Sequence, residues 1–296
     1  MDSPAQQHTV KSALDEAGRG LADAGVPSPR DEARLLLACA LGQPTSWVMA
    51  HPEQTPDPEA LGLFHQYVAR RSRLEPVAYI LGRREFYSLD LQVTPAVLIP
   101  RPETEMLVEM GLTACRQLAA VRERPLRVVE LGTGSGAISI ALASRFSGAD
   151  FLAIDSSPPA LEVARRNAET HEVSRRIKFH LGSLLVDVTG LVDVLVANLP
   201  YIPSDEMPHL MPDVRLYEPA EALDGGPDGT ALIRQALQQS VSLMNRPAML
   251  LFEIGHGQGA LVKTLALESY PDASVAVQLD YAGLERVLAI QIVGWC

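Results

Sequence analysis

The sequence from residue 128 to residue 142 reads Val128-Val-Glu-Leu-Gly132-Thr-Gly134-Ser-Gly136-Ala137-Ile-Ser-Ile-Ala-Leu142, which is typical of a short apolar strand, a glycine-rich turn and an apolar helix. Glycine tolerates positive φ and has no Cβ, so a ligand can approach such a turn closely. The helix begins with free N–H groups that attract carboxylate or phosphate oxygens. The stretch therefore predicts a cofactor site. It also fits the dinucleotide pattern Gly-x-Gly-x-x-Gly/Ala, so on its own it leaves NAD and S-adenosylmethionine both open.

Two carboxylates near this turn are suited to a nucleoside cofactor. Glu130 stands two residues before the first glycine, where it can hold the ammonium group of S-adenosylmethionine. Asp155 follows the next apolar run, 19 residues beyond the last glycine of the turn (155 − 136 = 19). A carboxylate at about this distance commonly accepts hydrogen bonds from both ribose hydroxyls. The alternative for Asp155 is an N-cap of the helix that begins at Pro158, a role that Ser156 or Ser157 can also fill. Ribose binding is the favoured prediction.

The tetrad Asn198-Leu-Pro-Tyr201 follows the apolar run 193–197 and is suited to gripping a planar NH2 group. The Asn198 side-chain oxygen can accept one N–H, and the Leu199 carbonyl can accept the other. Pro200 limits where that carbonyl points, because the residue before proline is pushed into an extended conformation. Tyr201 offers a flat face for the target group. The alternative is an ordinary strand that runs into a proline-containing turn.

From Leu126 onward, strands and helices alternate in the pattern of a parallel, doubly wound sheet. We expect strands at 127–131, 150–154, 177–180, 193–197, 248–254, 274–279 and 284–293, and helices near 136–145, 158–170, 229–244 and 257–268. The last two strands are joined by a short turn and can form an antiparallel pair at the sheet edge. In such folds the ligand lies at the carboxyl ends of the strands, where Glu130, Gly132–Gly136, Asp155, Ser183 and Asn198 converge.

The chain before this alternating region has a different organisation. Residues 1 to about 75 carry apolar residues at helical spacing, which predicts several helices. Residues 85–99 alternate more like a short β-hairpin, which we interpret as a linker between domains. A helix at 103–117 then leads into the first strand of the larger domain.

The composition narrows the class of protein. Apolar residues make up 47% of the chain, enough for a sizeable core, and no apolar run approaches the ~20 residues of a membrane span. Residues 1–8 lack the basic and apolar regions of a signal peptide. The three cysteines, Cys39, Cys115 and Cys296, are widely separated and odd in number, so we expect reduced thiols in a soluble, cytoplasmic protein. The seven histidines are scattered, so no metal site is expected.

The net charge of −11 disfavours a nucleic-acid partner, because phosphate binding needs cations. A local exception is the arginine cluster, which we define as Arg70, Arg71, Arg73, Arg83 and Arg84. This cluster is either a docking patch for a partner or solvated helix surface, and solvated surface is the favoured interpretation.

Several strings resemble the protein-(glutamine) methyltransferases that modify class I peptide-chain release factors, and the resemblance runs over nearly the whole chain. The most specific string is Leu98-Ile-Pro-Arg-Pro-Glu-Thr-Glu105, which separates this branch from the related enzyme acting on a ribosomal protein and from adenine methyltransferases. The other matching strings are Pro29–Leu37, Arg73–Gly82 followed by Glu85-Phe-Tyr, Glu218–Gly226 and Phe252–Gln258.

The resemblance implies an α/β fold: a Rossmann-like, seven-stranded methyltransferase sheet, mostly parallel with an antiparallel edge pair. It implies an N-terminal helical substrate-docking domain at 1–84, a β-hairpin linker at 85–100 and an S-adenosylmethionine-dependent methyltransferase domain at 101–296. The implied reaction methylates the amide nitrogen of the Gly-Gly-Gln glutamine in translation termination and releases S-adenosyl-L-homocysteine. We expect a monomer whose partner is the release factor, with no nucleic acid and no membrane.

The resemblance also implies roles for individual residues. The residues expected to bind the cofactor are Gly132, Thr133, Gly134, Ser135, Gly136, Asp155, Ser183, Leu184 and Asn198, together with Glu130, which is suited to the ammonium group. The residues expected to hold the substrate glutamine are Asn198, Leu199, Pro200 and Tyr201.

Three positions depart from the family pattern, and one segment has two interpretations. The family usually has proline at Leu199, whose carbonyl survives the change, so function is expected to survive. It often has Asp and an aromatic at Ser183 and Leu184, and losing the aromatic wall would weaken adenine binding. The segment 102–105 is either a helix cap or, as the resemblance implies, part of the active site.

Three rival functions stay open at the level of sequence. An adenine methyltransferase would use the same grip on an exocyclic amine, but the acidic net charge and the absence of an obvious recognition domain count against it. A methyltransferase for a ribosomal-protein glutamine is disfavoured by the string 100–105. A non-catalytic module that docks a release factor is disfavoured by the intact glycine turn, Asp155 and Asn198.

Overall fold

The computed structural model describes residues 9–294. The signal-peptide expectation for residues 1–8, and Cys296, therefore lie outside the described residues. The chain divides into two compact units. One comprises the residues up to Gly82 together with Met211–Tyr217, and the other comprises Arg83–Leu210 and the residues from Glu218 onward. The sequence pattern did not predict that the segment 211–217 belongs with the N-terminal helices.

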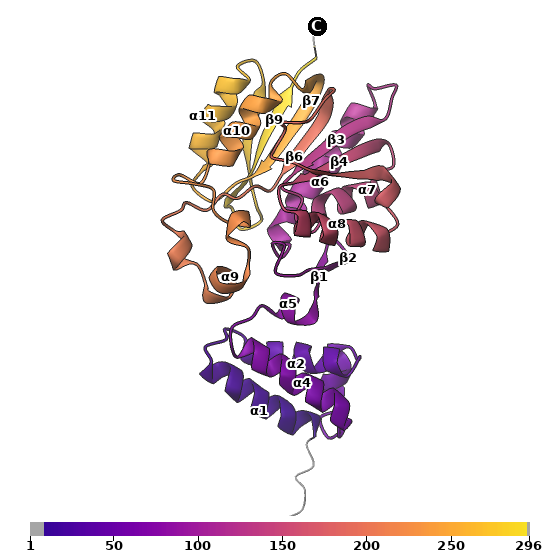
Figure 1. Cartoon of the computed structure of the whole chain (residues 1–296), viewed down its shortest axis with the longest axis vertical. Helices are drawn as coiled ribbons and strands as arrows, with labels where there is room; N and C mark the ends of the chain where they lie inside the picture. The colour runs from indigo at the N-terminus through magenta and orange to yellow at the C-terminus, as the bar shows by residue number, and fades with distance from the viewer. Residues whose placement is uncertain (1–8, 295–296) are drawn as a thin grey trace, which may run out of the picture. The chain divides into compact units, whose positions relative to one another are not determined.

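The first unit is helical, and Figure 1 draws its residues up to Gly82 in indigo to purple and its segment 211–217 in orange. Its helices are α1 (Val10–Asp23), α2 (Pro29–Ala40), α3 (Thr45–Ala50), α4 (Pro58–Arg71), α5 (Val77–Leu81) and α9 (Pro212–Tyr217). The longer helices α1, α2 and α4 bury Leu21, Leu37 and Phe64 in one apolar cluster. Asp57 caps α4 by accepting the Ala60 N–H at 2.9 Å. Helices α3, α5 and α9 are too short to show an apolar period, so the sequence did not predict them.

The arginine cluster is held partly inside the first unit. Arg71 is only 3% exposed, and its Nε lies 2.5 Å from Oε2 of Glu32 in α2. Asp213 of α9 lies 3.9 Å from the Arg71 Nη2. Arg70 pairs with Glu75 at 2.5 Å. The favoured interpretation as solvated surface is therefore wrong for Arg71, because its guanidinium is buried and joins α4 to α2 and α9.

The predicted β-hairpin is present, and it belongs to the larger unit. Strand β1 (Arg83–Phe86) pairs antiparallel with β2 (Leu89–Gln92). Asn167 of α8 (Pro158–Thr170) is buried, and its Oδ1 accepts the Gln92 N–H at 2.7 Å. Its Nδ2 donates to the Gln92 carbonyl at 3.0 Å and to the Ser135 carbonyl at 2.8 Å. The hairpin is thus fastened to the glycine turn, while the domain boundaries at 84 and 100 stay predictions.

The larger unit is built on a seven-stranded sheet in the order β5-β4-β3-β6-β7-β9-β8. The strands are β3 (Leu126–Leu131), β4 (Ala149–Asp155), β5 (Ile177–Leu181), β6 (Val192–Ala197), β7 (Met244–Glu253), β8 (Ser274–Leu279) and β9 (Glu285–Ile292). Strands β3 to β7 pair in parallel, and β9 runs antiparallel to both β7 and β8. This confirms the prediction of a mostly parallel seven-stranded sheet with an antiparallel final pair. Strand β9 lies between β7 and β8, however, so of this final pair only β8 is at an edge of the sheet.

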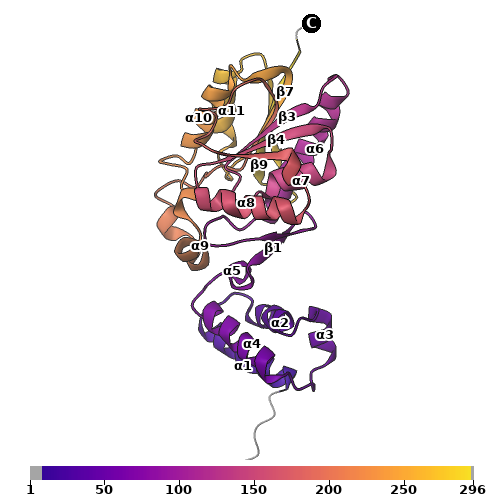
Figure 2. The same ribbon diagram turned by 45° about the vertical axis from the view of Figure 1, so that its right-hand side comes forward.

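Helices cover both faces of the sheet (Figures 1 and 2). Helices α6 (Glu105–Ala119), α7 (Ala137–Arg145) and α8 lie on one face, and α10 (Ala231–Ser240) and α11 (Gly259–Ser269) lie on the other. Val194 and Val196 of β6 pack in the cluster that includes residues of α6 and α7, and Leu195 packs in the cluster that includes residues of α10 and α11. A strand buried on both faces has a continuous apolar sequence, as β6 has from Val194 to Ala197. Within residues 9–294, no helix is long and apolar enough to cross a membrane.

Candidate active site

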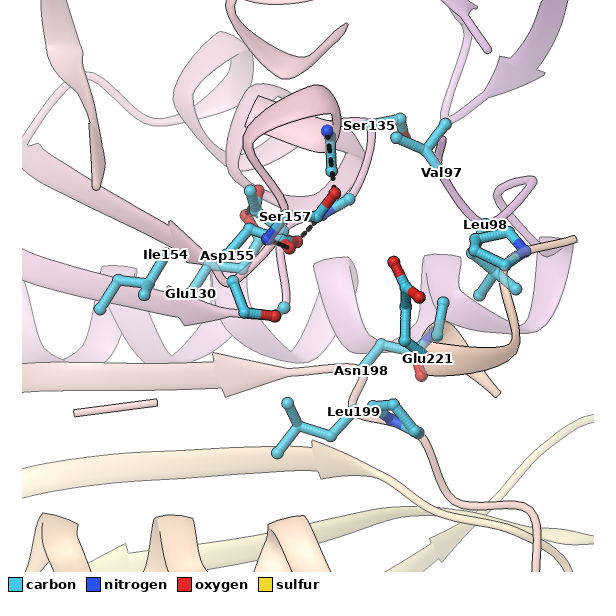
Figure 3. Close-up of a pocket in the computed structure, with 18 of the residues that line it drawn as sticks. Val97, Leu98, Glu130, Ser135, Ile154, Asp155, Ser157, Asn198, Leu199 and Glu221 are labelled. Carbon is cyan, nitrogen blue, oxygen red and sulfur yellow. Dashed lines mark hydrogen bonds between the residues drawn. The ribbon is translucent and has the colours of Figure 1, made fainter. Parts of the chain in front are cut away.

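The candidate site lies at the carboxyl ends of β3 and β6, adjacent central strands between which the strand order reverses. Open α/β sheets bind their ligands at such a switch point. Strand β3 leads into the glycine turn, and β6 leads into the tetrad that begins at Asn198. Figure 3 shows Glu130, Asp155 and Asn198, from three different strands or strand ends, around one pocket.

The glycine turn, residues 132–136, contains glycines with a left-handed backbone conformation, and side chains of other segments pack closely against them. Gly132 and Gly136 have φ of +67° and +83°. A Cβ on Gly136 would lie 2.8 Å from Cδ1 of Ile140 and 3.2 Å from Cβ of Ala164, so glycine there lets the start of α7 pack against α8. A Cβ on Gly132 would lie 3.3 Å from Cδ2 of Leu199. The turn therefore brings the loop after β3 close to the tetrad after β6.

Glu130 is a buried carboxylate at the base of the pocket. It is 1% exposed, and its Oε2 accepts the Thr133 hydroxyl at 2.7 Å and the Ser139 N–H at 3.1 Å. Burial raises the pKa of Glu130 to about 7, although hydrogen bonds from Ser139 and Thr133 oppose the rise. A cation placed beside this carboxylate would favour its charged form.

Asp155 holds the glycine turn in place at the end of β4. Its Oδ2 accepts the Gly134 N–H at 2.8 Å, and its Oδ1 accepts the Ser157 N–H at 2.9 Å. The N-cap of α8 is Ser157, whose hydroxyl accepts the Ala160 N–H at 3.3 Å. Burial raises the pKa of Asp155, and the hydrogen bond from Gly134 is the largest influence that opposes the rise. Asp155 is therefore not the helix cap: one of its oxygens bonds the glycine turn and the other bonds the backbone before α8.

Asn198 and the two residues after it line the pocket. The half-buried Asn198 donates from Nδ2 to the Thr104 hydroxyl at 3.1 Å, which leaves its Oδ1 as an acceptor. The Leu199 side chain is buried in the apolar cluster that includes residues of α10 and α11. Thr104 is the N-cap residue that precedes α6, but its side chain makes no cap hydrogen bond there. The helix-cap interpretation of the segment 102–105 is therefore wrong for the Thr104 hydroxyl, which lies in the site.

Tyr201 supports the tetrad instead of lining the pocket. Its hydroxyl donates to Oε1 of Glu253 at 3.3 Å, and its carbonyl accepts from Nε2 of Gln258 at 2.8 Å. Burial and the neighbouring Glu253 carboxylate raise the pKa of Tyr201. This geometry does not match the expectation that the Tyr201 ring packs on the target group. It also gives the string Phe252–Gln258 a task, which is to fix the backbone and side chain of Tyr201.

The string Glu218–Gly226 holds a second wall of the pocket. The buried Glu218 carboxylate forms an ion pair with Arg101 and accepts the Ile99 N–H at 3.1 Å. The Gly225 N–H donates to the Ile202 carbonyl at 2.8 Å. Because Arg101 lines the pocket, its ion pair with Glu218 holds a cationic side chain beside the pocket.

The pocket gathers the predicted residues with two exceptions. Gly136 and Tyr201 do not line it. The predicted residues that do are Glu130, Gly132, Thr133, Gly134, Ser135, Asp155, Ser183, Leu184, Asn198, Leu199 and Pro200. Lining residues that were not predicted individually include Leu98, Arg101, Thr104 and Glu221. All four lie in the strings 98–105 and 218–226, so the signal was present without an assigned role.

Comparisons with known proteins agree with this architecture. Residues 12–82 match the family described as PrmC N-terminal domain, and residues 108–215 match ribosomal protein L11 methyltransferase (PrmA). The release factor glutamine methyltransferase of Moorella thermoacetica is 43% identical over 94% of this chain and 96% of its own length. The protein of the same name from Vibrio cholerae is 39% identical over 94% of this chain and 95% of its own length.

Solved structures show the same fold at low sequence identity. A methyltransferase from Pyrococcus furiosus has a TM-score of 0.50 and 17% identity, over 70% of this chain and 91% of that one. The hMettl16 catalytic domain, in complex with a MAT2A 3′UTR hairpin, has a TM-score of 0.54 and 17% identity, over 79% and 81%. The sheet, the glycine turn and the pocket thus define a methyltransferase. The chain belongs to the release factor glutamine methyltransferase family, which confirms the resemblance.

Proposed function

We propose that this protein transfers a methyl group from S-adenosyl-L-methionine to the side-chain amide nitrogen of the Gly-Gly-Gln glutamine in class I peptide-chain release factors. The observation that carries the proposal is that Asn198 and the glycine turn Gly132–Ser135 line one pocket. This arrangement supports the proposal, because the residues expected to bind the cofactor and the residue expected to hold the amide line the same pocket. Membership of the family supports glutamine as the acceptor. The protein would act in translation termination in the cytoplasm and release S-adenosyl-L-homocysteine.

The residues of the pocket fit the proposed cofactor. Asp155 would accept the ribose hydroxyls with the lone pairs that its bonds to Gly134 and Ser157 leave available. Glu130, buried beside the glycine turn, would face the ammonium group, and that cation would favour the charged form of its carboxylate. Ser183 and the buried Leu184 would lie beside the adenine.

The chemistry depends on positioning. An amide nitrogen is a poor nucleophile because its lone pair is delocalised into the carbonyl. The bound cofactor supplies a methyl group on a sulfonium, which is a strong electrophile. Asn198 Oδ1 and the Leu199 carbonyl would accept the two N–H groups and stabilise the positive charge that grows on nitrogen. Correct orientation can contribute about 7–11 kcal/mol. No general base is required, because the methylated amide is acidic enough to lose its proton to water.

We also propose that the helical unit docks the release factor. The predicted cofactor and amide-binding residues all belong to the larger unit, so the helical unit is available for another task. A chain lacking the residues up to Gly82, with a short glycine-serine linker in place of 211–217, should still bind S-adenosylmethionine but should largely lose methylation of an intact release factor. Circular dichroism must show that this chain is folded. Equal methylation by the shortened and full-length chains would refute docking.

The proposed reaction is tested by incubating the protein with methyl-labelled S-adenosylmethionine and a class I release factor, then mapping the label by mass spectrometry. Label on the Gly-Gly-Gln glutamine, and none on a release factor carrying asparagine at that position, is the expected result. A single-stranded oligonucleotide in a parallel reaction tests the adenine alternative. Label on the oligonucleotide, or on another residue of the release factor, would contradict the proposal.

A further inference from the structure

We infer that Gln258 is a positioning residue that holds the backbone of the tetrad Asn198–Tyr201 and thereby sets where the Leu199 carbonyl points. The inference rests on the proposed function for its meaning in catalysis. Its structural content is that one side-chain amide bonds backbone groups of three segments: the end of the tetrad, the loop that contains Asp228 and the loop between β7 and α11.

Gln258 stands at the start of α11 without the usual task of a residue in that position. It is the N-cap residue of the helix, and its side chain makes no cap hydrogen bond there. Its Oε1 instead accepts the Gly255 N–H at 2.8 Å, and its Nε2 donates to the Tyr201 carbonyl at 2.8 Å and to the Asp228 carbonyl at 3.4 Å. The amide therefore spends its donors and an acceptor on backbone groups.

These partners give the Gln258 amide a single orientation. A backbone N–H only donates and a backbone carbonyl only accepts, so Oε1 must face Gly255 and Nε2 must face Tyr201 and Asp228. Rotation of the amide by 180° would set donor against donor and acceptor against acceptor. The bond to the Tyr201 carbonyl, at 2.8 Å, is shorter than the 3.3 Å bond between the Tyr201 hydroxyl and Glu253. Tyr201 is therefore held more closely by its backbone than by its ring.

Gly229 leaves the room that this contact needs. It has a φ of +71°, and a Cβ on it would lie 2.2 Å from the Tyr201 carbonyl oxygen and 2.4 Å from Nε2 of Gln258. Non-bonded heavy atoms pack at about 3.5–4.0 Å, so a side chain at position 229 would push Gln258 away from Tyr201. Glycine at this position is therefore required for the bond between Gln258 and Tyr201.

The held carbonyl lies close in the chain to the residues proposed to bind the substrate amide. Before it, the Leu199 side chain is buried in the core, and the ring of Pro200 fixes the φ of that residue. After it, the hydrogen bond from Gln258 fixes the backbone of Tyr201. The peptide unit that carries the Leu199 carbonyl lies between these two anchors. Gln258 does not line the pocket, so it acts on the substrate amide only through this backbone.

The first test compares two replacements of Gln258 in the full-length protein. Gln258→Leu removes the whole amide, whereas Gln258→Glu keeps its size and an acceptor for Gly255 but, ionised at about pH 8, has no donor for Tyr201. We expect each to lower kcat about 10- to 100-fold, because a misplacement of about 1 Å can cost 100-fold. The KM for the release factor and the Kd for S-adenosylmethionine should stay within about threefold, since Gln258 lies outside the pocket. The matched control is Gln238→Leu, at an exposed glutamine of α10.

The second test asks whether Gly229 and Gln258 act through one contact. Gly229→Ala should lower kcat as Gln258→Leu does. The variant with both changes should stay within about twofold of the slower single variant, whereas independent effects would multiply. Gly283→Ala is the matched control and should keep the wild-type kcat, because Gly283 has a similar φ of +78° and open space around its Cβ position.

The third test detects the contact without activity. In a proton–nitrogen spectrum of protein labelled with 15N-glutamine, the side-chain NH2 pair that disappears in Gln258→Leu and in Gln258→Glu belongs to Gln258. Both of its hydrogens are bonded, so we expect it to exchange with solvent more slowly than the pair of the exposed Gln238, which Gln238→Leu assigns. Gly229→Ala should shift the Gln258 pair and speed its exchange, and Gly283→Ala should leave it unchanged.

The possible outcomes distinguish this inference from the proposed function. A wild-type kcat in folded Gln258→Leu and Gln258→Glu would overturn the inference, and so would multiplied losses in the variant with both changes or a Gln258 pair that exchanges as fast as that of Gln238. A wild-type protein that methylates no release factor would instead count against the proposed function, and the exchange measurement would still decide whether Gln258 holds the tetrad. If Gln258→Leu fails to fold, Gln258→Glu and Gly229→Ala carry the comparison.

Discussion

Asp155 Oδ2 accepts the backbone N–H of Gly134 at 2.8 Å, so a carboxylate at the end of β4 fixes the middle of the glycine turn that follows β3. The same side chain faces the pocket with its remaining lone pairs. Loss of this carboxylate would therefore remove a support of the turn together with the ligand contact proposed for Asp155.

Replacing Asp155 by alanine should weaken S-adenosylmethionine binding more than it lowers the rate at saturating cofactor. The ribose does not change during the reaction, so its contacts contribute equally to the ground state and the transition state. Loss of a hydrogen bond to a charged group costs about 1.5–3 kcal/mol, or roughly 10- to 100-fold in Kd. Calorimetric titration measures this. Asp155→Asn, which keeps an acceptor for Gly134, separates the two tasks, and an unchanged Kd in Asp155→Ala would remove Asp155 from the cofactor site.

Replacing Asn198 by alanine should lower kcat by about 10²- to 10³-fold, the loss measured when one oriented polar group is removed from an active site. The side chain is half-buried and not part of the apolar core, so the thermal transition should move little. Steady-state methylation assays and thermal melts check the two statements. Turnover within about threefold of wild type, a difference under 1 kcal/mol, would show that the assigned role is wrong.

Replacing Leu199 by proline should preserve methyl transfer, because in the proposed function only the carbonyl of this residue holds the substrate amide. The Leu199 side chain is 4% exposed and packs in the core, so the smaller ring should cost some stability, about 1–2 kcal/mol. Kinetics and urea unfolding of one preparation separate the effects. A large loss of rate with an unchanged unfolding midpoint would mean that the side chain or N–H of Leu199 has its own task.

The stability of the protein without ligand should fall as the pH rises from about 4.5 to above 7, in part because of Glu130. Its pKa is raised from 4.5 to about 7 by burial, so the native state binds this proton more tightly than the unfolded state does. The stabilisation is complete below pH 4.5 and is lost as the pH passes 7; it amounts to about 3 kcal/mol. Glu130→Gln should flatten the difference between urea unfolding at pH 5 and at pH 8. Parallel pH dependences for wild type and variant would contradict the assignment.

Replacing Glu32 by alanine should destabilise the helical unit by up to about 3–5 kcal/mol, because it leaves the buried Arg71 guanidinium without its main partner. Asp213, 3.9 Å away, should offset part of the loss. The matched control is Asp31→Ala in the same helix, which removes an exposed ion pair with Arg34 and should cost at most about 1 kcal/mol. Urea unfolding followed by circular dichroism measures both, and equal costs would show that burial does not distinguish these pairs.

Regular elements with long apolar patterns could be predicted from the sequence. Most of strand β6 is apolar because helices cover both of its faces. The glycine turn could be recognised because a left-handed backbone favours glycine. Residues at strand ends could be assigned to one site, since parallel strands bring their carboxyl ends to one edge. The placement of Glu130, Asp155 and Asn198 around one pocket follows from that rule.

Contacts between distant segments could not be predicted in the same way. The bond between Thr104 and Asn198 joins residues 94 positions apart, and that between Tyr201 and Glu253 joins residues 52 apart. No local pattern encodes either contact, so Thr104 resembled a helix cap and Tyr201 resembled a flat wall of the pocket. The position of β9 inside the sheet could not be predicted for the same reason. The short turn before β9 predicts that it pairs with β8, but no local pattern shows that β7 lies on its other side.

The return of residues 211–217 to the helical unit matters for synthesis on the ribosome. Tyr217 follows Gly82 by 135 residues (217 − 82 = 135), and translation at about 5–20 residues per second needs roughly 7–27 s to cover that distance. During this interval the nascent helices α1 to α5 exist without α9, and Arg71 has Glu32 but not Asp213 beside it. The helical unit therefore cannot finish folding before most of the larger unit is synthesised, because its last helix is made only after that part has been translated.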